Sequence, residues 1–318
     1  MIQFHPTLTA WWSPSQSRWH LRLFLYIILD HVNIPVLISH KTELQGHLDL
    51  NAPKAHLLAL NETHLQRGDL SVGGYCVVAR LDRRDGRSGG GITLLAVPEV
   101  APCITLLEHA QDLSHERSWF AIHADLGAVL LCVWYRPPCR GEIASIQAFE
   151  REWSRLSPDY LGSIVVGDLN VHHTHWLKHS DSVLFEGSRL RRFCVENGFR
   201  QLFNGPTHEA GNLLDLCLTD LGEVESCKTL PRVADHNVIR LAFNLAVPVE
   251  RARPRTVFDY KTAPWHVINE RFLSTDWSWI SCTDVDTATR ELTEYILHTL
   301  HDHIQTKIIY DKVAVHPW

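Results

Sequence analysis

Short apolar runs that end in polar residues recur along the first three quarters of the chain, and each predicts a buried strand. Runs of this length are typical of strands, whereas helices usually need ten or more residues. The runs occupy residues 23–29, 56–60, 92–97, 128–134, 164–166 and 238–243. Between them, leucines at 44, 48 and 50 predict an amphipathic helix over residues 39–50. Apolar spacing also predicts helices over 147–156 and 189–195.

The run at 164–166 is followed by Gly167, Asp168 and Asn170. The glycine predicts a turn of the backbone, and if the strand persists, side chains two residues apart lie on the same face. A carboxylate and a carboxamide would then project together from a strand end, where α/β folds commonly build their sites. The alternative is an Asx turn, because Asp and Asn are frequent in turns.

Composition restricts the class of protein. The chain has 318 residues and 45% hydrophobic residues, enough for a large core. A formal net charge of −6 argues against a generic basic nucleic-acid binder, so any basic face must be local. Eight cysteines without a CxxC pair indicate reduced thiols in an intracellular protein. The apolar stretch at 21–29 is too short to span a bilayer, and no secretory signal precedes it.

Five segments, taken together and in order, resemble the motifs of the endonuclease/exonuclease/phosphatase superfamily. Similar strings occur in the apurinic-type endonuclease domain of non-LTR (LINE-like) retrotransposons. The segments cover residues 61–64, 134–138, 167–170, 212–219 and 234–237, and each lies beside an apolar run. Two positions depart from the family pattern: Ala234 stands where the family usually has Ser, and Ile34-Pro35 follows Asn33.

The resemblance covers residues 22–245 and implies a four-layered α/β sandwich of DNase I type: two packed mixed sheets flanked by helices. It also implies an Mg²⁺-dependent phosphodiesterase, with Mn²⁺ as an alternative ion. In this chain the implied metal ligands are Glu62, Asn33 and Asp235.

The catalytic roles that the resemblance implies also map onto single residues. Asp168 would activate the attacking water and Asn170 would position it or the phosphate. His236, oriented by Asp215, would donate to a phosphate oxygen, and Tyr135 would contact the phosphate.

DNA is the expected partner, and no membrane is expected. The candidate DNA contacts are basic or imidazole side chains near these motifs, namely Arg136, His172, His173, Arg191 and Arg192. For the arginines of the helix at 189–195 a solvated face is an equal alternative. The glycine-rich loop at 80–91 is either a phosphate approach or the solvated tip of a hairpin.

The expected organisation is an N-terminal arm over 1–20, the endonuclease domain over 21–247, and a linker with a helical extension over 248–318. The extension resembles the stretch that precedes a reverse transcriptase in LINE-like elements. The expected function is DNA nicking for a retrotransposon, in the nucleus if active. The alternatives are an abasic-site repair nuclease, a phosphatase of the same superfamily, or an inactive remnant that acts as a binding module.

Overall fold

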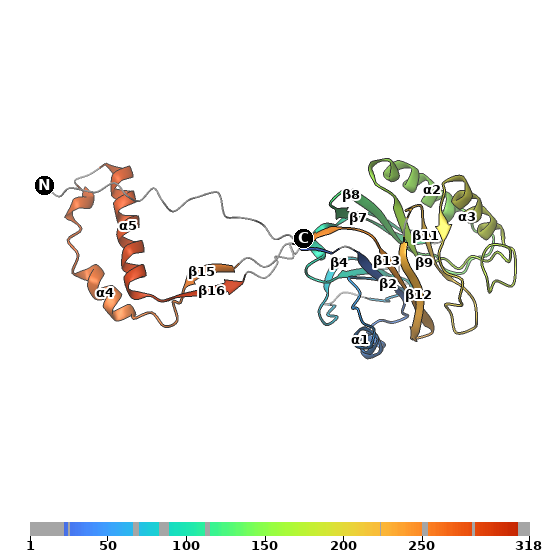
Figure 1. Cartoon of the computed structure of the whole chain (residues 1–318), viewed down its shortest axis with the longest axis horizontal. Helices are drawn as coiled ribbons and strands as arrows, with labels where there is room; N and C mark the ends of the chain where they lie inside the picture. Colours follow the sequence, from blue (N-terminus) through green and yellow to red (C-terminus); the bar gives the residue numbers. More distant parts are fainter. Residues whose placement is uncertain are drawn as a thin grey trace. The chain divides into compact units, whose positions relative to one another are not determined.

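The computed structural model describes residues 22–24, 26–65, 70–82, 89–111, 115–222, 224–249, 254–281 and 284–310 (Figure 1). These residues fall into two compact units, one within residues 1–250 and one within 251–314. The expected arm at 1–20 lies outside the described residues, and so do residues 83–88 of the glycine-rich loop.

The described part of the first unit contains two six-stranded sheets. Their strand orders are β10-β11-β9-β8-β7-β6 and β12-β13-β2-β3-β5-β4, with β1 and β14 paired separately. The pairs β2/β3 and β8/β9 are parallel and the other pairs antiparallel, so both sheets are mixed. The strands are β1 Arg22–Phe24, β2 Ile27–Asn33, β3 Leu57–Asn61, β4 Cys76–Leu81, β5 Ile92–Ala96, β6 Ile104–Gln111, β7 Glu116–Ala124, β8 Gly127–Tyr135, β9 Ser163–Asp168, β10 Arg200–Gln201, β11 Asp215–Thr219, β12 Val224–Val233, β13 His236–Phe243 and β14 Val247–Val249.

The two sheets pack face to face, and helices cover their outer faces (Figure 1). Between the sheets, Leu29 and Leu94 of one pack in a single buried cluster with Val133 and Val165 of the other. Three α-helices lie outside the sheets: α1 Lys41–Leu50 on one side, and α2 Ala144–Leu156 and α3 Phe185–Glu196 on the other. The predicted four-layered α/β sandwich is therefore confirmed.

Aromatic and aliphatic side chains fasten these helices. Leu44 of α1 is buried with Val32 and Leu58 on the outer face of one sheet. Phe149 of α2 stacks on Trp134 with ring centroids 4.7 Å apart, and it meets Phe193 of α3 edge to face. The helices therefore bury the apolar stripes that the sequence pattern predicted.

Strand register brings the predicted site residues to one end of the sandwich. Asn33 pairs with Asn61 at the ends of the parallel strands β2 and β3, directly before Glu62. In the other sheet, Asp168 at the end of β9 pairs with Asp215 at the start of β11. The end of β9 therefore faces the ends of β2 and β3 across the sandwich.

Gly167 does not make the turn predicted for it. Strand β9 continues through Gly167 to Asp168 and stays paired with β11. A Cβ atom on Gly167 would lie 1.7 Å from the carbonyl oxygen of Trp134 on the neighbouring strand β8. Glycine is needed because the two backbones approach closely, which is a second common reason for glycine in a strand.

The second unit contains the predicted helix and a strand pair that was not predicted. Helices α4 Trp265–Leu273 and α5 Val285–His303 accompany the antiparallel pair β15 Pro254–Phe258 and β16 Thr306–Tyr310. Asp284 caps α5 by accepting a 3.0 Å hydrogen bond from the Thr287 amide. Short 3₁₀ helices cover Ala101–Cys103, Ser157–Asp159 and Ser278–Ser281. Among the described residues, none of the helices is long and apolar enough to cross a membrane.

Candidate active site

Asn33 is the central residue of a buried polar cluster between the two sheets. Its Nδ2 donates to Asp168 Oδ2 at 2.8 Å and to Glu62 Oε1 at 3.1 Å, and lies 3.5 Å from His236 Nε2. One amide group thus touches three side chains from different strand ends. Four of the residues predicted from the sequence are therefore neighbours in space.

His236 and Asp215 form a buried pair beside Asn33. The Nδ1–H of His236 donates to Asp215 Oδ2 at 2.7 Å. Burial alone would lower the pKa of His236, but the Asp215 carboxylate, with smaller effects of Asp168 and Asp235, raises it to about 9. Burial would raise the pKa of Asp215, yet His236 holds it below its usual value. The pair is an imidazolium and a carboxylate at neutral pH, with the Nε2–H of His236 directed into the site.

A second histidine, which the sequence reasoning missed, lies behind this pair. The fully buried His31 has its Nδ1 3.6 Å from Asp215 Oδ1 and its Nε2 2.5 Å from Asn61 Oδ1. Burial lowers the pKa of His31, which keeps its ring neutral. Its position two residues before Asn33 on β2, on the same strand face, was the available signal.

Asp168 sits where its negative charge is poorly compensated. Burial, and then the charge of Asp215, raise the pKa of Asp168 to about 8, while His236 acts in the opposite direction. Its Oδ1 atom is buried and has no hydrogen-bond partner among the described residues. A buried carboxylate without a compensating partner is stable only when it is protonated or when a cation binds to it.

The cluster fits a divalent metal ion. Among the described residues, the buried oxygens Asn33 Oδ1 and Asp235 Oδ1 also have no hydrogen-bond partner. Carboxylate and carboxamide oxygens are the ligands that Mg²⁺ prefers, usually one or two carboxylates with water completing the shell. Glu62 is half-buried, so its side chain is in part accessible to water.

Backbone strain is concentrated around the cluster. Glu62, His64, Asn170 and Ala234 have positive φ values of 53°, 48°, 46° and 58°. Such conformations cost about 1–3 kcal/mol each for residues other than glycine and gather at functional sites. Ala234 is the position where the family pattern usually has Ser.

Asn170 and Tyr135 lie near the cluster in positions that differ from the simple expectation. Strand β9 ends at Asp168, so Asn170 is not on its face; the Asn170 Nδ2 donates to the Arg136 carbonyl at 3.0 Å. The Asn170 side chain still reaches Asp168 and acts to lower the pKa of its carboxyl. Tyr135 is buried at the end of β8. Their catalytic roles stay predictions.

Two of the predicted DNA contacts are buried in the structure. Arg136 is fully buried, and its guanidinium donates to the carbonyl oxygens of Cys139 and Glu142 at 2.9 and 2.7 Å. His173 is buried in the loop after β9, where its ring packs edge to face on Trp176. Arg136 therefore holds a loop and offers no exposed atom to DNA, whereas the DNA contact of His173 stays a prediction.

The other three predicted DNA contacts remain available. Arg191 and Arg192 are exposed on α3. His172 is half-buried, with its Nδ1 3.6 Å from the exposed Asp181. These three residues stay predictions for DNA binding.

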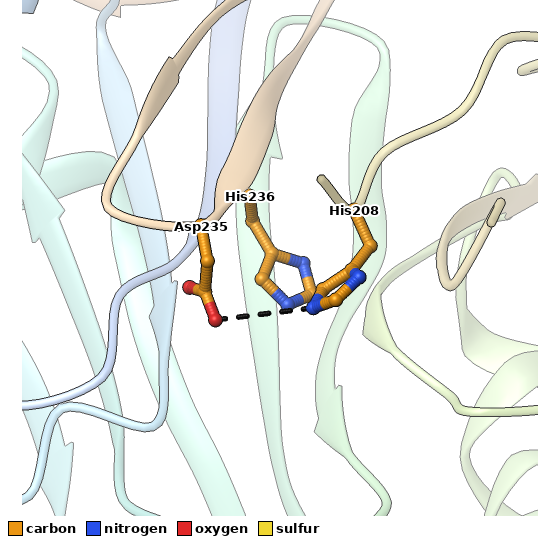
Figure 2. Close-up of side chains that lie close together, drawn as sticks. All are labelled: His208, Asp235 and His236. Atoms are coloured by element: carbon orange, nitrogen blue, oxygen red, sulfur yellow. Dashed lines mark ion pairs between the residues drawn. The ribbon is translucent and has the colours of Figure 1, made fainter. Parts of the chain in front are cut away.

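His208 completes the surroundings of His236 and was not identified from the sequence. It lies in the loop before β11, and its ring meets the His236 ring edge to face with centroids 4.9 Å apart (Figure 2). Its Nε2 is 3.9 Å from Asp235 Oδ2. The sequence offered no signal, because His208 belongs to none of the five motif segments.

Comparisons with known proteins agree with this fold. Residues 129–240 match a family described as "Endonuclease-reverse transcriptase". No curated protein matches the chain in sequence. The endonuclease domain of TRAS1, a telomere-specific non-LTR retrotransposon, is similar with a TM-score of 0.54 at 14% identity, covering 69% of this chain and 99% of that one.

Two further solved structures are similar to the chain. The AP endonuclease LMAP from Leishmania major has a TM-score of 0.52 at 16% identity, covering 70% of this chain and 89% of that one. A 3′ phosphatase from Neisseria, bound to product DNA, has a TM-score of 0.48 at 12% identity and covers 68% and 98%. At these identities the likeness concerns the fold. The chain thus has the fold of the endonuclease/exonuclease/phosphatase superfamily, and its residues 129–240 match the endonuclease-reverse transcriptase family.

Proposed function

We propose that this chain is a divalent-metal-dependent phosphodiesterase that nicks DNA. The observation that carries the proposal is the contact of Asn33 with Glu62, Asp168 and His236, which sets an imidazolium beside two carboxyl groups. Hydrolysis of a phosphodiester needs a base for water, a donor for the developing charge and a cation beside the phosphate. Each of these requirements has a candidate residue within this cluster.

Glu62, Asn33 and Asp235 would hold Mg²⁺ or Mn²⁺, as the sequence predicted. The bound ion would supply Lewis-acid stabilisation of the phosphate. The Asn33 amide keeps the Glu62 and Asp168 carboxyl groups within 3.1 Å of its Nδ2. This arrangement places two carboxyl groups side by side before a cation binds.

Asp168 would accept the proton of the attacking water through Oδ1, the oxygen without a hydrogen-bond partner among the described residues. Its pKa of about 8 is near the operating pH, which suits a general base. His236 would donate its Nε2–H to a phosphate oxygen. Asp215 holds Nδ1 and so fixes which ring nitrogen points at the substrate.

Three observations support DNA as the substrate. The matched family is described as endonuclease-reverse transcriptase, and the TRAS1 domain is an endonuclease. The exposed pair Arg191 and Arg192 on α3 also offers two cations that could meet phosphates. We therefore favour DNA as the substrate, nicked by an endonuclease that belongs to a retrotransposon.

The test is nicking of supercoiled plasmid with Mg²⁺ and with EDTA. Asp168→Asn and His236→Asn should each slow nicking by about 100-fold or more, since each removes a proton-transfer group. The exposed residues Asp125 and His123 give matched controls, Asp125→Asn and His123→Asn, which should nick like the wild type. Equal nicking by all four variants would reject the assigned site.

An abasic-site endonuclease is the second candidate, favoured by the fold likeness to the Leishmania AP endonuclease. A duplex with one abasic site, compared with the same duplex intact, separates the two. Faster cleavage at the abasic position would indicate repair, and equal cleavage would indicate general nicking.

A further inference from the structure

His208 and Asp235 lie beside His236 at the rim of the candidate active site (Figure 2). One ligand atom from each of the three lies within 4.8 Å of the other two. We propose that these residues form a site for Zn²⁺, which shares Asp235 with the proposed Mg²⁺ site and differs from it by its two nitrogen ligands.

The backbone holds the three residues together. His208 forms a bridge with His236, and the Glu209 amide donates to the Asp235 carbonyl at 3.0 Å. The Asn237 amide donates to the Thr207 carbonyl at 2.7 Å on the other side. The loop before β11 is therefore fastened to the start of β13, and His208 is placed by hydrogen bonds rather than by chance contact.

The ligand chemistry favours zinc over magnesium. Two imidazoles and one carboxylate are a typical three-ligand set for zinc, with a fourth position left for water. Mg²⁺ prefers oxygen ligands. Asp235 faces the two histidines with Oδ2, which lies 3.9 Å from His208 Nε2 (Figure 2).

The Asp215–His236 pair strengthens the same conclusion. A carboxylate on one imidazole nitrogen orients the ring and makes the other nitrogen a better metal ligand. Asp215 occupies Nδ1 of His236 at 2.7 Å, which leaves Nε2 for the ion. The arrangement that directs a proton from Nε2 to a phosphate also directs Nε2 to a metal once that proton has left.

Binding requires two small adjustments. The 3.9 Å between His208 Nε2 and Asp235 Oδ2 must shorten, because two ligands of a tetrahedral zinc ion with bonds of about 2.0–2.2 Å lie roughly 3.5 Å from each other. His208 must also move its proton to Nδ1 and so give up the 3.1 Å hydrogen bond from the Ala210 amide. His208 is half-buried and Ala210 is exposed, so water can replace that bond.

A consequence for regulation rests on the proposed function. Zinc on His236 Nε2 would replace the proton that His236 donates to the phosphate. Zn²⁺ should therefore inhibit Mg²⁺-dependent nicking, and His208 should determine the sensitivity without taking part in the reaction.

The test is calorimetric titration of the whole chain with ZnCl₂ in the presence of Mg²⁺. His208→Asn is the informative variant, because an Asn side chain can keep the bond from the Ala210 amide while removing the ligand nitrogen. His123→Asn, at an exposed histidine on β7, is the matched control. The exposed thiols of Cys139 and Cys227 are present in every variant, so the difference between variants isolates His208.

The expected result is zinc binding that weakens by about tenfold or more in His208→Asn and not in His123→Asn. Equal zinc affinity in wild type and His208→Asn would overturn the proposal. If zinc inhibits plasmid nicking by the wild type and by His123→Asn but not by His208→Asn, the regulatory consequence would be supported as well. Since calorimetry needs no activity, a chain that never nicks would reject the proposed function and still decide on the zinc site.

Discussion

Asp168 shows how a single side chain can be unfavourable for stability and suited to chemistry. It is fully buried, close to Asp215 and Glu62, and its carboxyl has a pKa of about 8. A buried charge without full compensation costs free energy. That cost would be recovered when a divalent cation binds, which couples metal binding to folding.

The pH dependence of stability follows from this pKa. In the unfolded chain Asp168 ionises near 3.8, whereas in the folded chain it holds its proton up to about 8. The folded state binds more protons across this range, so the free energy of unfolding of the metal-free protein should fall as pH rises through it. The pKa of His236 is raised from 6.5 to about 9, so this group also makes the free energy of unfolding fall as pH rises between these two values.

Asp168→Asn should therefore stabilise the metal-free protein while removing nicking. The gain in unfolding free energy should be large near pH 8 and small near pH 4, where Asp168 is protonated in the folded state and close to its titration midpoint of 3.8 in the unfolded chain. Urea unfolding in EDTA at both pH values measures this, with Asp125→Asn as the control. A gain that is independent of pH would contradict the burial of an ionisable carboxyl at this position.

Asp215→Asn tests whether the Asp215 carboxylate sets the pKa of His236. Without the Asp215 carboxylate, burial is left as the main effect and the pKa of His236 should fall from about 9 toward or below its usual 6.5. NMR titration of the His236 ring in metal-free protein reads this directly. Nicking at neutral pH should fall by about 100-fold or more, because the imidazolium is lost. An unchanged His236 titration would show that Asp215 does not set its charge.

At the scale of elements, the apolar runs predicted strands well where both faces are buried. Strands β3, β5 and β9 are buried along their length and β8 over all but its first two residues, and each was predicted within a few residues. Strand β12 was not predicted because it is mostly exposed at a sheet edge and has no apolar run. Strand β7 was not predicted because its first residues, Glu116 and Arg117, are charged although they are buried.

The position of a site residue relative to the apolar runs likewise explains whether it could be predicted from the sequence. Glu62, Asp168 and His236 follow or begin apolar strands, so local patterns mark them. His31 and His208 become neighbours of Asp215 and His236 only through sheet register and a loop bridge. Burial of Arg136 and His173 likewise depends on how loops fold back, which no spacing in the sequence records.

Gly167→Ala tests the close approach of β8 and β9. A methyl group there would meet the Trp134 carbonyl at 1.7 Å, so the strands must separate. The free energy of unfolding should fall by about 3 kcal/mol or more, as for severe overpacking, and Asp168 next to it should lose its position. Chemical denaturation and plasmid nicking measure the two effects. Gly222→Ala is the control, because nothing lies within 4 Å of its Cβ position.

At the scale of the whole molecule, the proposed chemistry belongs to the first unit alone. Every residue assigned to the metal, the base and the acid lies between Asn33 and His236, within the unit that ends near residue 250. The second unit has its own strand pair and helices, with α5 capped by Asp284. A chain that ends at residue 250 should therefore fold and nick plasmid with Mg²⁺ at a rate close to that of the full chain.

The measurement compares residues 1–250 with residues 1–318 by thermal unfolding and by nicking at several DNA concentrations. A lower apparent affinity with an unchanged maximal rate would give the second unit a role in DNA binding. A shortened chain that unfolds cooperatively but does not nick, even at saturating DNA and Mg²⁺, would contradict the assignment, because residues beyond 250 would then be needed for the chemistry. Asp168→Asn in the shortened chain should abolish the remaining activity, which shows that the same site is measured in both.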